Sequence, residues 1–160
     1  MIGGIIGDIV GSIYEFRNIK TKDFELFVDG CKYTDDSVLT IATADWLLHG
    51  GQSATYYADW GNAYPYAGYG GMFSEWLDAS IKREPKSSNC LSIWLRNIIS
   101  KGHNKSKAEV VPPPYNSCGN GSAMHVGPVG WAFNTKEEVL EFAKRSAECT
   151  HNHPEGIKGA

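Results

Sequence analysis

Apolar residues recur at intervals of three and four positions in several separate stretches of this sequence, and this spacing constrains the fold more than any other feature. In the first stretch, from Ile2 to Phe16, the recurring residues are Ile2, Ile5, Ile6, Ile9, Val10, Ile13 and Tyr14. We predict a buried helix here, with glycines that let another backbone approach closely. Alternation of apolar and polar residues nowhere exceeds about four positions, and no internal repeat is found. The sequence therefore predicts an all-α fold.

The remaining periodic stretches predict further helices. One begins after residues 33–37 and stops at the glycines of 49–51, and a capping box from Thr135 to Glu138 opens another that reaches Ala147. Additional helices are expected at residues 53–60, 71–81 and 91–99, with loops at 64–71 and 103–114. A chain of 160 residues can bury a core of its own, so we expect one domain over residues 1–160.

Charge and cysteine usage exclude several classes of protein. A net charge of −3, without a basic block, argues against nucleic acid as a partner. The apolar start is interrupted by Asp8 and carries no basic residues, so we expect neither a signal peptide nor a membrane anchor. The cysteines form no C-x-x-C pair, which predicts reduced thiols and a cytoplasmic protein. They are Cys31, Cys90, Cys118 and Cys149.

Residues 34–37 place two carboxylates and two hydroxyls in consecutive positions. These residues are Thr34, Asp35, Asp36 and Ser37. Oxygen ligands of this kind suit magnesium, manganese or calcium. The alternative is an ordinary helix N-cap, because Thr and Asp are favoured there by hydrogen bonding and by the helix dipole.

Asp8 and Glu15 are seven positions apart, so on a helix they project from the same face. A carboxylate such as Glu15, close to a hard metal ion, could position or deprotonate a water molecule for attack on an acetal carbon. Alternatively, Glu15 is a solvated helix end or a partner for Arg17.

Two further segments carry polar groups in tight turns. Residues 117–124 form a glycine-rich turn whose backbone N–H groups could hold an anion such as a diphosphate, or which is simply a structural turn. Residues 150–156 contain His151 and His153, which could ligate a transition metal or could be exposed in a capping turn before Pro154.

Together and in order, these segments resemble the ADP-ribosylglycohydrolase family. The matching motifs are G-x-x-x-G-D-x-x-G-S-x-Y-E at 3–15, Y-T-D-D-S at 33–37, G-N-G-S-A-M at 119–124 and T-H-N-H-P-E-G at 150–156. The resemblance implies a compact multi-helix bundle with a binuclear magnesium or manganese site. It also implies hydrolysis of the glycosidic bond between ADP-ribose and a protein side chain or another acceptor.

The resemblance implies a role for individual residues as well. Thr34, Asp35 and Asp36 would bind metal, Glu15 would be the acid beside the scissile bond, and Asp8 would support the site. The residues expected to line the pocket for the diphosphate or ribose are Gly119, Asn120, Gly121, Ser122, Met124 and His151. The substrate would be an ADP-ribosylated protein or an ADP-ribose-like small molecule.

Two departures from the family pattern modify these expectations. His125 stands where relatives carry an arginine, which changes how substrate phosphate would be held. The aspartate-rich D-x-D-T type motif of relatives has no match, so we expect a fold that is incomplete at the C-terminus, at most one weakly bound metal, and self-association or a complementary chain. The alternatives are a catalytically impaired ADP-ribose-binding or structural protein, and an unrelated magnesium-dependent phosphohydrolase.

Overall fold

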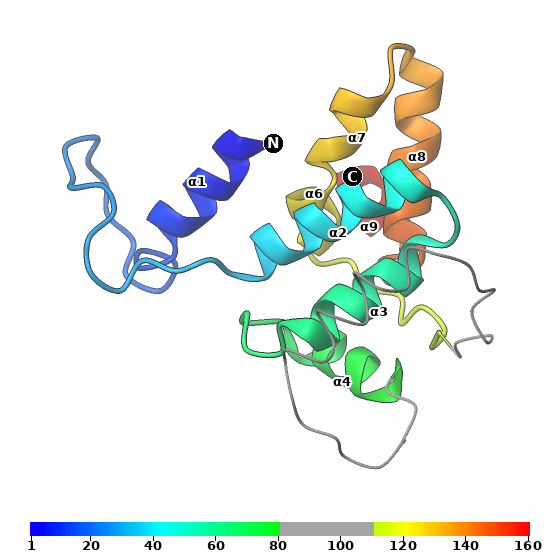
Figure 1. The fold of residues 1–160 in the computed structure, drawn as a ribbon, viewed down its shortest axis with the longest axis horizontal. Coiled ribbons are helices and arrows are strands. Elements are labelled where there is room, and N and C mark those ends of the chain that lie inside the picture. The colour runs from blue at the N-terminus through cyan, green and yellow to red at the C-terminus, as the bar shows by residue number, and fades with distance from the viewer. Residues whose placement is uncertain (81–110) are drawn as a thin grey trace.

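The computed structural model describes residues 1–80 and 111–160, and every regular element in these two stretches is an α-helix (Figure 1). The helices are α1 (Ile2–Gly11), α2 (Asp35–His49), α3 (Ser53–Ala63), α4 (Gly71–Ser80), α6 (Gly121–His125), α7 (Gly127–Ala132), α8 (Lys136–Glu148) and α9 (Pro154–Gly159). The all-α prediction is confirmed for this part of the chain. The helix predicted at 91–99, the loop at 103–109 and Cys90 lie outside the described residues.

Helix α2 lies at the centre of the fold and contacts α1, α3, α6 and α7 (Figure 1). It has buried residues on several sides because its neighbours surround it, and Trp46 is only 2% exposed. The main core cluster consists of Leu39, Ala42, Ala54, Tyr57, Ala58, Phe73, Trp76 and Leu77. Burial of each large apolar side chain contributes roughly 1.5–3 kcal/mol, so this cluster fixes α2 against α3 and α4.

Helix α1 differs from its prediction in length and in burial. It ends at Gly11, where the Ser12 hydroxyl donates to the Ile9 carbonyl at 2.9 Å and accepts from the Lys32 backbone N–H at 3.1 Å. These side-chain hydrogen bonds compete with continuation of the helix, so the chain turns away. Val10 is the only buried residue of α1.

The expected close approach of another backbone to the α1 glycines was wrong. A Cβ atom built on Gly3, Gly4, Gly7 or Gly11 would meet nothing within 4 Å among the described residues. Gly4, Gly7 and Gly11 line an open pocket instead. Helix α1 packs against α2.

The C-terminal half combines one confirmed helix start with one short helix that was not predicted. Thr135 caps α8, since its hydroxyl accepts from the Glu138 backbone N–H at 3.3 Å and donates to the Glu138 carboxylate at 2.6 Å. Helix α7 was missed because two of its six residues are glycines, which weaken a helical pattern. At the start of α9, Pro154 follows the N-cap His153, whose ring accepts from the Glu155 backbone N–H.

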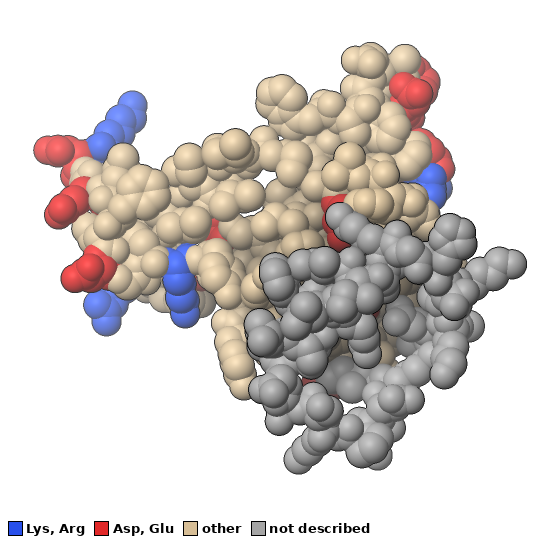
Figure 2. Space-filling model, in the orientation of Figure 1, with Lys and Arg blue, Asp and Glu red and all other residues tan. Residues whose placement is uncertain are grey.

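The surface is uneven in charge. On the face shown in Figure 2, charged side chains gather at the two ends, and the described surface between them is largely neutral. Three large apolar side chains are largely exposed: Ile2 at 76%, Leu48 at 80% and Trp131 at 80%. Exposed apolar side chains are typical of surfaces that bind another chain, and the expected self-association or complementary chain stays a prediction. Among the described residues, no helix is long and apolar enough to cross a membrane.

Candidate active site

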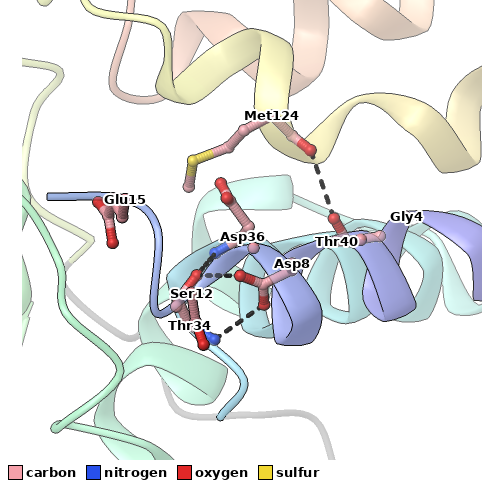
Figure 3. Close-up of a pocket in the computed structure, with 10 residues that line it drawn as sticks. Gly4, Asp8, Ser12, Glu15, Thr34, Asp36, Thr40 and Met124 are labelled. Carbon is pink, nitrogen blue, oxygen red and sulfur yellow. Dashed lines mark hydrogen bonds between the residues drawn. The ribbon is translucent and has the colours of Figure 1, made fainter. Parts of the chain in front are cut away.

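Asp8 of α1 reaches the start of α2 and holds it through four hydrogen bonds, two of which, to Thr34, are shown in Figure 3. Its Oδ2 accepts from the Thr34 backbone N–H at 2.8 Å, and from the Ser37 hydroxyl and backbone N–H at 2.5 and 3.3 Å. Its Oδ1 accepts from the Thr34 hydroxyl at 2.5 Å. A carboxylate has about four lone-pair positions, so these bonds leave Asp8 little capacity for a further ligand. The arrangement is compatible with a supporting role.

Thr34 is the N-cap of α2, so the capping interpretation of this turn is confirmed. Its hydroxyl oxygen accepts from the Asp36 backbone N–H at 3.3 Å and gives its proton to Asp8. A threonine oxygen has two lone pairs, and the cap uses one of them. The second remains available beside the pocket that Thr34 lines, so capping and ligation are compatible.

Thr34, Asp36, Asp8 and Glu15 line one cavity of about 370 Å³, which we call the acidic pocket (Figure 3). Its other lining residues are Gly4, Gly7, Gly11, Ser12, Thr40 and Met124. Asp8 and Glu15 line the same pocket, as expected, but the expected reason was wrong, because Glu15 lies in the turn after α1 and does not share a helix face with Asp8. None of the three ion pairs found in the described residues involves Glu15 or Arg17.

The acidic groups of this region perturb one another. Burial raises the pKa of Asp36, and the charges of Asp8 and Glu15 raise it further. The pKa of Asp35 is raised to about 7, first by burial and then by the charge of Asp36, with smaller effects of Glu15 and Asp8. Repulsion among these carboxylates is the electrostatic environment that a bound cation relieves.

Asp35 lines a second cavity of about 270 Å³, which we call the histidine pocket. Its other lining residues include Phe73, Tyr115, Ser117, Gly119, Asn120, Gly121, Met124, His125 and His151. Met124 also lines the acidic pocket, so the two pockets adjoin at this side chain. The structure therefore separates the two aspartates that the sequence places side by side.

Five of the six residues expected to bind substrate lie around the histidine pocket. Ser122 does not, because it is completely buried and its hydroxyl donates to the Gly156 carbonyl at 2.6 Å. His151 is 8% exposed, and its Nδ1 lies 2.8 Å from the Thr150 hydroxyl. A Cβ on Gly121 would come within 2.9 Å of the His151 ring, so Gly121 allows this imidazole its position. The alternative in which His151 is an exposed residue of a capping turn is therefore wrong.

Tyr69 is a candidate residue that sequence reasoning missed. Within the described part of the chain, its hydroxyl is the one buried side-chain N or O atom without a hydrogen-bond partner. Burial raises its pKa, and electrostatic interactions with Asp35 and, to a smaller extent, with Tyr33 add to this shift. The aromatic loop at 64–71 was visible in the sequence, but nothing there indicated that it lies beside Asp35.

The described residues contain no group of three or more His, Cys, Asp or Glu side chains placed to hold a metal ion. Any metal ligation at the acidic pocket would therefore need oxygen from Thr34 in addition to carboxylates.

Comparison with known proteins identifies the family. The sequence profile described as ADP-ribosylglycohydrolase matches residues 1–160. The chain belongs to the ADP-ribosylglycohydrolase family. This confirms the resemblance that four ordered motifs indicated.

Two curated relatives of this ADP-ribosylglycohydrolase chain carry the name ADP-ribosylhydrolase ARH3. The protein from Gallus gallus is 25% identical over 185 aligned residues, which cover 100% of this chain and 46% of the relative. The protein from Bos taurus is 25% identical over 183 aligned residues, which cover 100% of this chain and 45% of the relative. The chain thus spans about half the length of these relatives.

Proposed function

We propose that this chain acts in metal-dependent hydrolysis of the glycosidic bond that links ADP-ribose to a protein side chain or to another acceptor. The observation that carries the proposal is the Asp8-anchored turn, which places Thr34, Asp36 and Glu15 around one pocket. Membership of the ADP-ribosylglycohydrolase family and the similarity to two proteins named ADP-ribosylhydrolase support the same reaction class.

The residues of the site fit a magnesium or manganese ion. At the acidic pocket, Thr34 retains one lone pair and Asp36 supplies hard carboxylate oxygens, and repulsion from Asp8 and Glu15 favours a cation there. Asp35 would offer its oxygens from the adjoining histidine pocket. The buried hydroxyl of Tyr69, near Asp35, has no hydrogen-bond partner among the described residues and is therefore an unused polar group beside the site. Bound magnesium or manganese supplies positive charge that stabilises developing negative charge and makes a nearby water more acidic.

The acidic groups of the chain would divide the remaining work. Glu15 is exposed at the edge of the acidic pocket and has no ion-pair partner among the described residues, so it can accept the proton of an attacking water. The water oxygen forms a bond to the anomeric carbon while the bond to the acceptor breaks. The released acceptor takes up a proton, so the overall reaction consumes one water molecule. Asp8 keeps Thr34 and the start of α2 in position throughout.

The histidine pocket would hold the ribose or diphosphate portion of the substrate. It adjoins the acidic pocket at Met124, so one extended ligand can occupy both. The glycine-rich turn at 119–121 lines this pocket, and free backbone N–H groups in such a turn would suit a diphosphate.

Release of ADP-ribose from ADP-ribosyl-arginine and ADP-ribosyl-serine peptides, in the presence of magnesium or manganese, tests the proposal. We expect release by the wild-type chain, loss of at least tenfold in rate in Asp36→Asn, and an unchanged rate in Asp78→Asn, an exposed acid on α4. Equal rates in the two variants would contradict the proposal. Binding of free ADP-ribose without turnover would favour the impaired binding protein, and release of phosphate from a phosphomonoester would favour the phosphohydrolase.

A further inference from the structure

His125, the last residue of α6, is a buried imidazole with one side in the core and the other at the histidine pocket. Only 2% of the residue is exposed. Its Nδ1 lies 3.2 Å from the Tyr57 hydroxyl and 3.2 Å from the Thr43 hydroxyl, and these two oxygens are 3.0 Å apart. Three polar atoms therefore form a closed triangle inside the core. The inference that follows rests on the proposed function for the identity of the ligand.

The number of protons available to this triangle determines the tautomer of His125. The Thr43 hydroxyl donates to the Leu39 carbonyl at 2.9 Å, so its proton points out of the triangle. If Nδ1 carries the imidazole proton, it donates within the triangle, Tyr57 donates to Thr43, and all three groups are satisfied. If Nε2 carries the proton, Nδ1 can only accept a hydrogen bond. Tyr57 then donates either to Nδ1 or to Thr43, and a second hydrogen bond within the triangle would require Thr43 to give up its bond to the Leu39 carbonyl. The Nδ1–H tautomer thus makes one hydrogen bond more.

The Nε2 edge of the ring is the one left to face the pocket. His125 is among the residues that line it, and its Nδ1 edge is occupied by the two hydroxyls. The free edge of the ring is therefore the one that meets a ligand.

We propose that His125 presents an unprotonated Nε2 to the histidine pocket and accepts a hydrogen bond there from a ribose hydroxyl of the ligand. This reverses the role expected for an arginine at the same position, because a guanidinium can only donate and selects phosphate. An imidazole nitrogen with a lone pair repels a phosphate oxygen but accepts from a hydroxyl. Tyr57 and Thr43 are positioning residues that fix the tautomer.

The surroundings keep the ring neutral. Burial, and to a smaller extent the charge of His151, lower the pKa of His125 to about 3 against the partly offsetting effect of a hydrogen bond to the backbone of His125 itself. Burial also lowers the pKa of His151. With Asp35 on the same pocket, the polar side chains of this wall include a second strong acceptor, which again suits a hydroxyl-bearing sugar.

Nitrogen-15 NMR of the imidazole rings at pH 7.5 tests the tautomer on the free protein, with no need for activity. We expect the chemical shifts of His125 to show a protonated Nδ1 and an unprotonated Nε2. Tyr57→Phe removes one member of the triangle, so we expect a measurable population of the Nε2–H tautomer. Tyr56→Phe is the matched control, because its hydroxyl lies near Asp45 and Asp59 instead, and should leave the His125 shifts unchanged. A protonated Nε2 in the wild-type chain would overturn the proposal.

Ligand titrations test the group that His125 recognises. ADP-ribose should shift the Nε2 signal, whereas inorganic pyrophosphate should not, and His125→Gln should weaken ADP-ribose binding roughly three- to tenfold, as expected for loss of one neutral hydrogen bond. A pyrophosphate-induced shift of Nε2 equal to that of ADP-ribose would contradict the assignment to a hydroxyl. If peptide hydrolysis is absent but these results hold, only the proposed reaction fails. If hydrolysis is present and Nε2 is protonated, only the inference on His125 fails.

Discussion

The carboxylate of Asp8 accepts hydrogen bonds from both the backbone N–H and the hydroxyl of Thr34, at 2.8 and 2.5 Å. This pair joins α1 to α2 across 26 positions of sequence. Helix α1 has a single buried residue of its own, so the polar junction, and not apolar burial, fixes the acidic pocket.

Replacement of Asp8 by Asn should loosen this junction. The amide keeps one acceptor oxygen but turns an NH₂ group toward the donors of Thr34 and Ser37, so at least one charge-assisted hydrogen bond is lost. We expect the free energy of unfolding to fall by about 1.5–3 kcal/mol, measured by urea denaturation. Asp23→Asn makes the same chemical change at an exposed position and should have no effect. Equal stability of the two variants would show that the junction contributes little.

Asp35→Asn should stabilise the chain at neutral and alkaline pH in the absence of metal. The folded-state pKa of Asp35 is about 7, above its usual 3.8, so the folded state resists ionisation. The resulting penalty is absent below pH 3.8, grows as the pH rises, and is complete above about pH 7. At pH 8 we expect a gain on the order of 1–2 kcal/mol, less than the full shift implies because Asp35 is partly exposed to solvent screening.

The pH dependence of this gain in stability tests whether ionisation of Asp35 is its cause. In urea denaturation, the free energy of unfolding of Asp35→Asn should exceed that of the wild type at pH 8 but not at pH 4. Asp78→Asn should match the wild type at both pH values. A gain of equal size at both values would mean that ionisation of Asp35 is not its source.

Acid should weaken the fold through His125. Its folded-state pKa of about 3 lies below its usual 6.5, so the stability due to the neutral ring is present above pH 6.5 and is lost as the pH falls toward 3. His125→Gln cannot take up this proton, so its stability should decline less steeply between pH 6.5 and 4, on the order of a few kcal/mol for a fully buried ring. Tyr56→Phe removes no group that titrates in this range and should keep the wild-type slope.

Gly121→Ala should impair ligand binding at the histidine pocket. The added Cβ would lie 2.9 Å from Cε1 and Nε2 of His151, so the imidazole must move. We expect ADP-ribose affinity to fall roughly tenfold, or about 1.4 kcal/mol, by isothermal titration calorimetry. Gly130→Ala on α7 adds a methyl group that meets nothing within 4 Å and should bind as the wild type does. Unchanged ADP-ribose affinity in Gly121→Ala would show that His151 does not take part in binding.

The sequence predicted features that depend on neighbouring residues. The periodic apolar residues predicted all the long described helices, and Thr34 and Thr135 were recognisable as caps because a cap bonds to a backbone group two or three positions ahead. The ordered motifs identified the family. The predicted end of α1 was wrong, because the hydrogen bond between Ser12 and Lys32 at this end joins residues 20 positions apart, which a local pattern does not reveal.

The tertiary structure alone decided how the candidate site is divided. Asp35 and Asp36 are adjacent in sequence, but successive residues of a helix point about 100° apart, so they line different pockets once α6 packs beside α2. His125 contacts Tyr57 and Thr43, which lie 68 and 82 positions earlier in the sequence, only because α6, α3 and α2 pack together. Local patterns encode helices and their ends, whereas the partners of a polar side chain depend on which helices pack together, and that depends on the whole core.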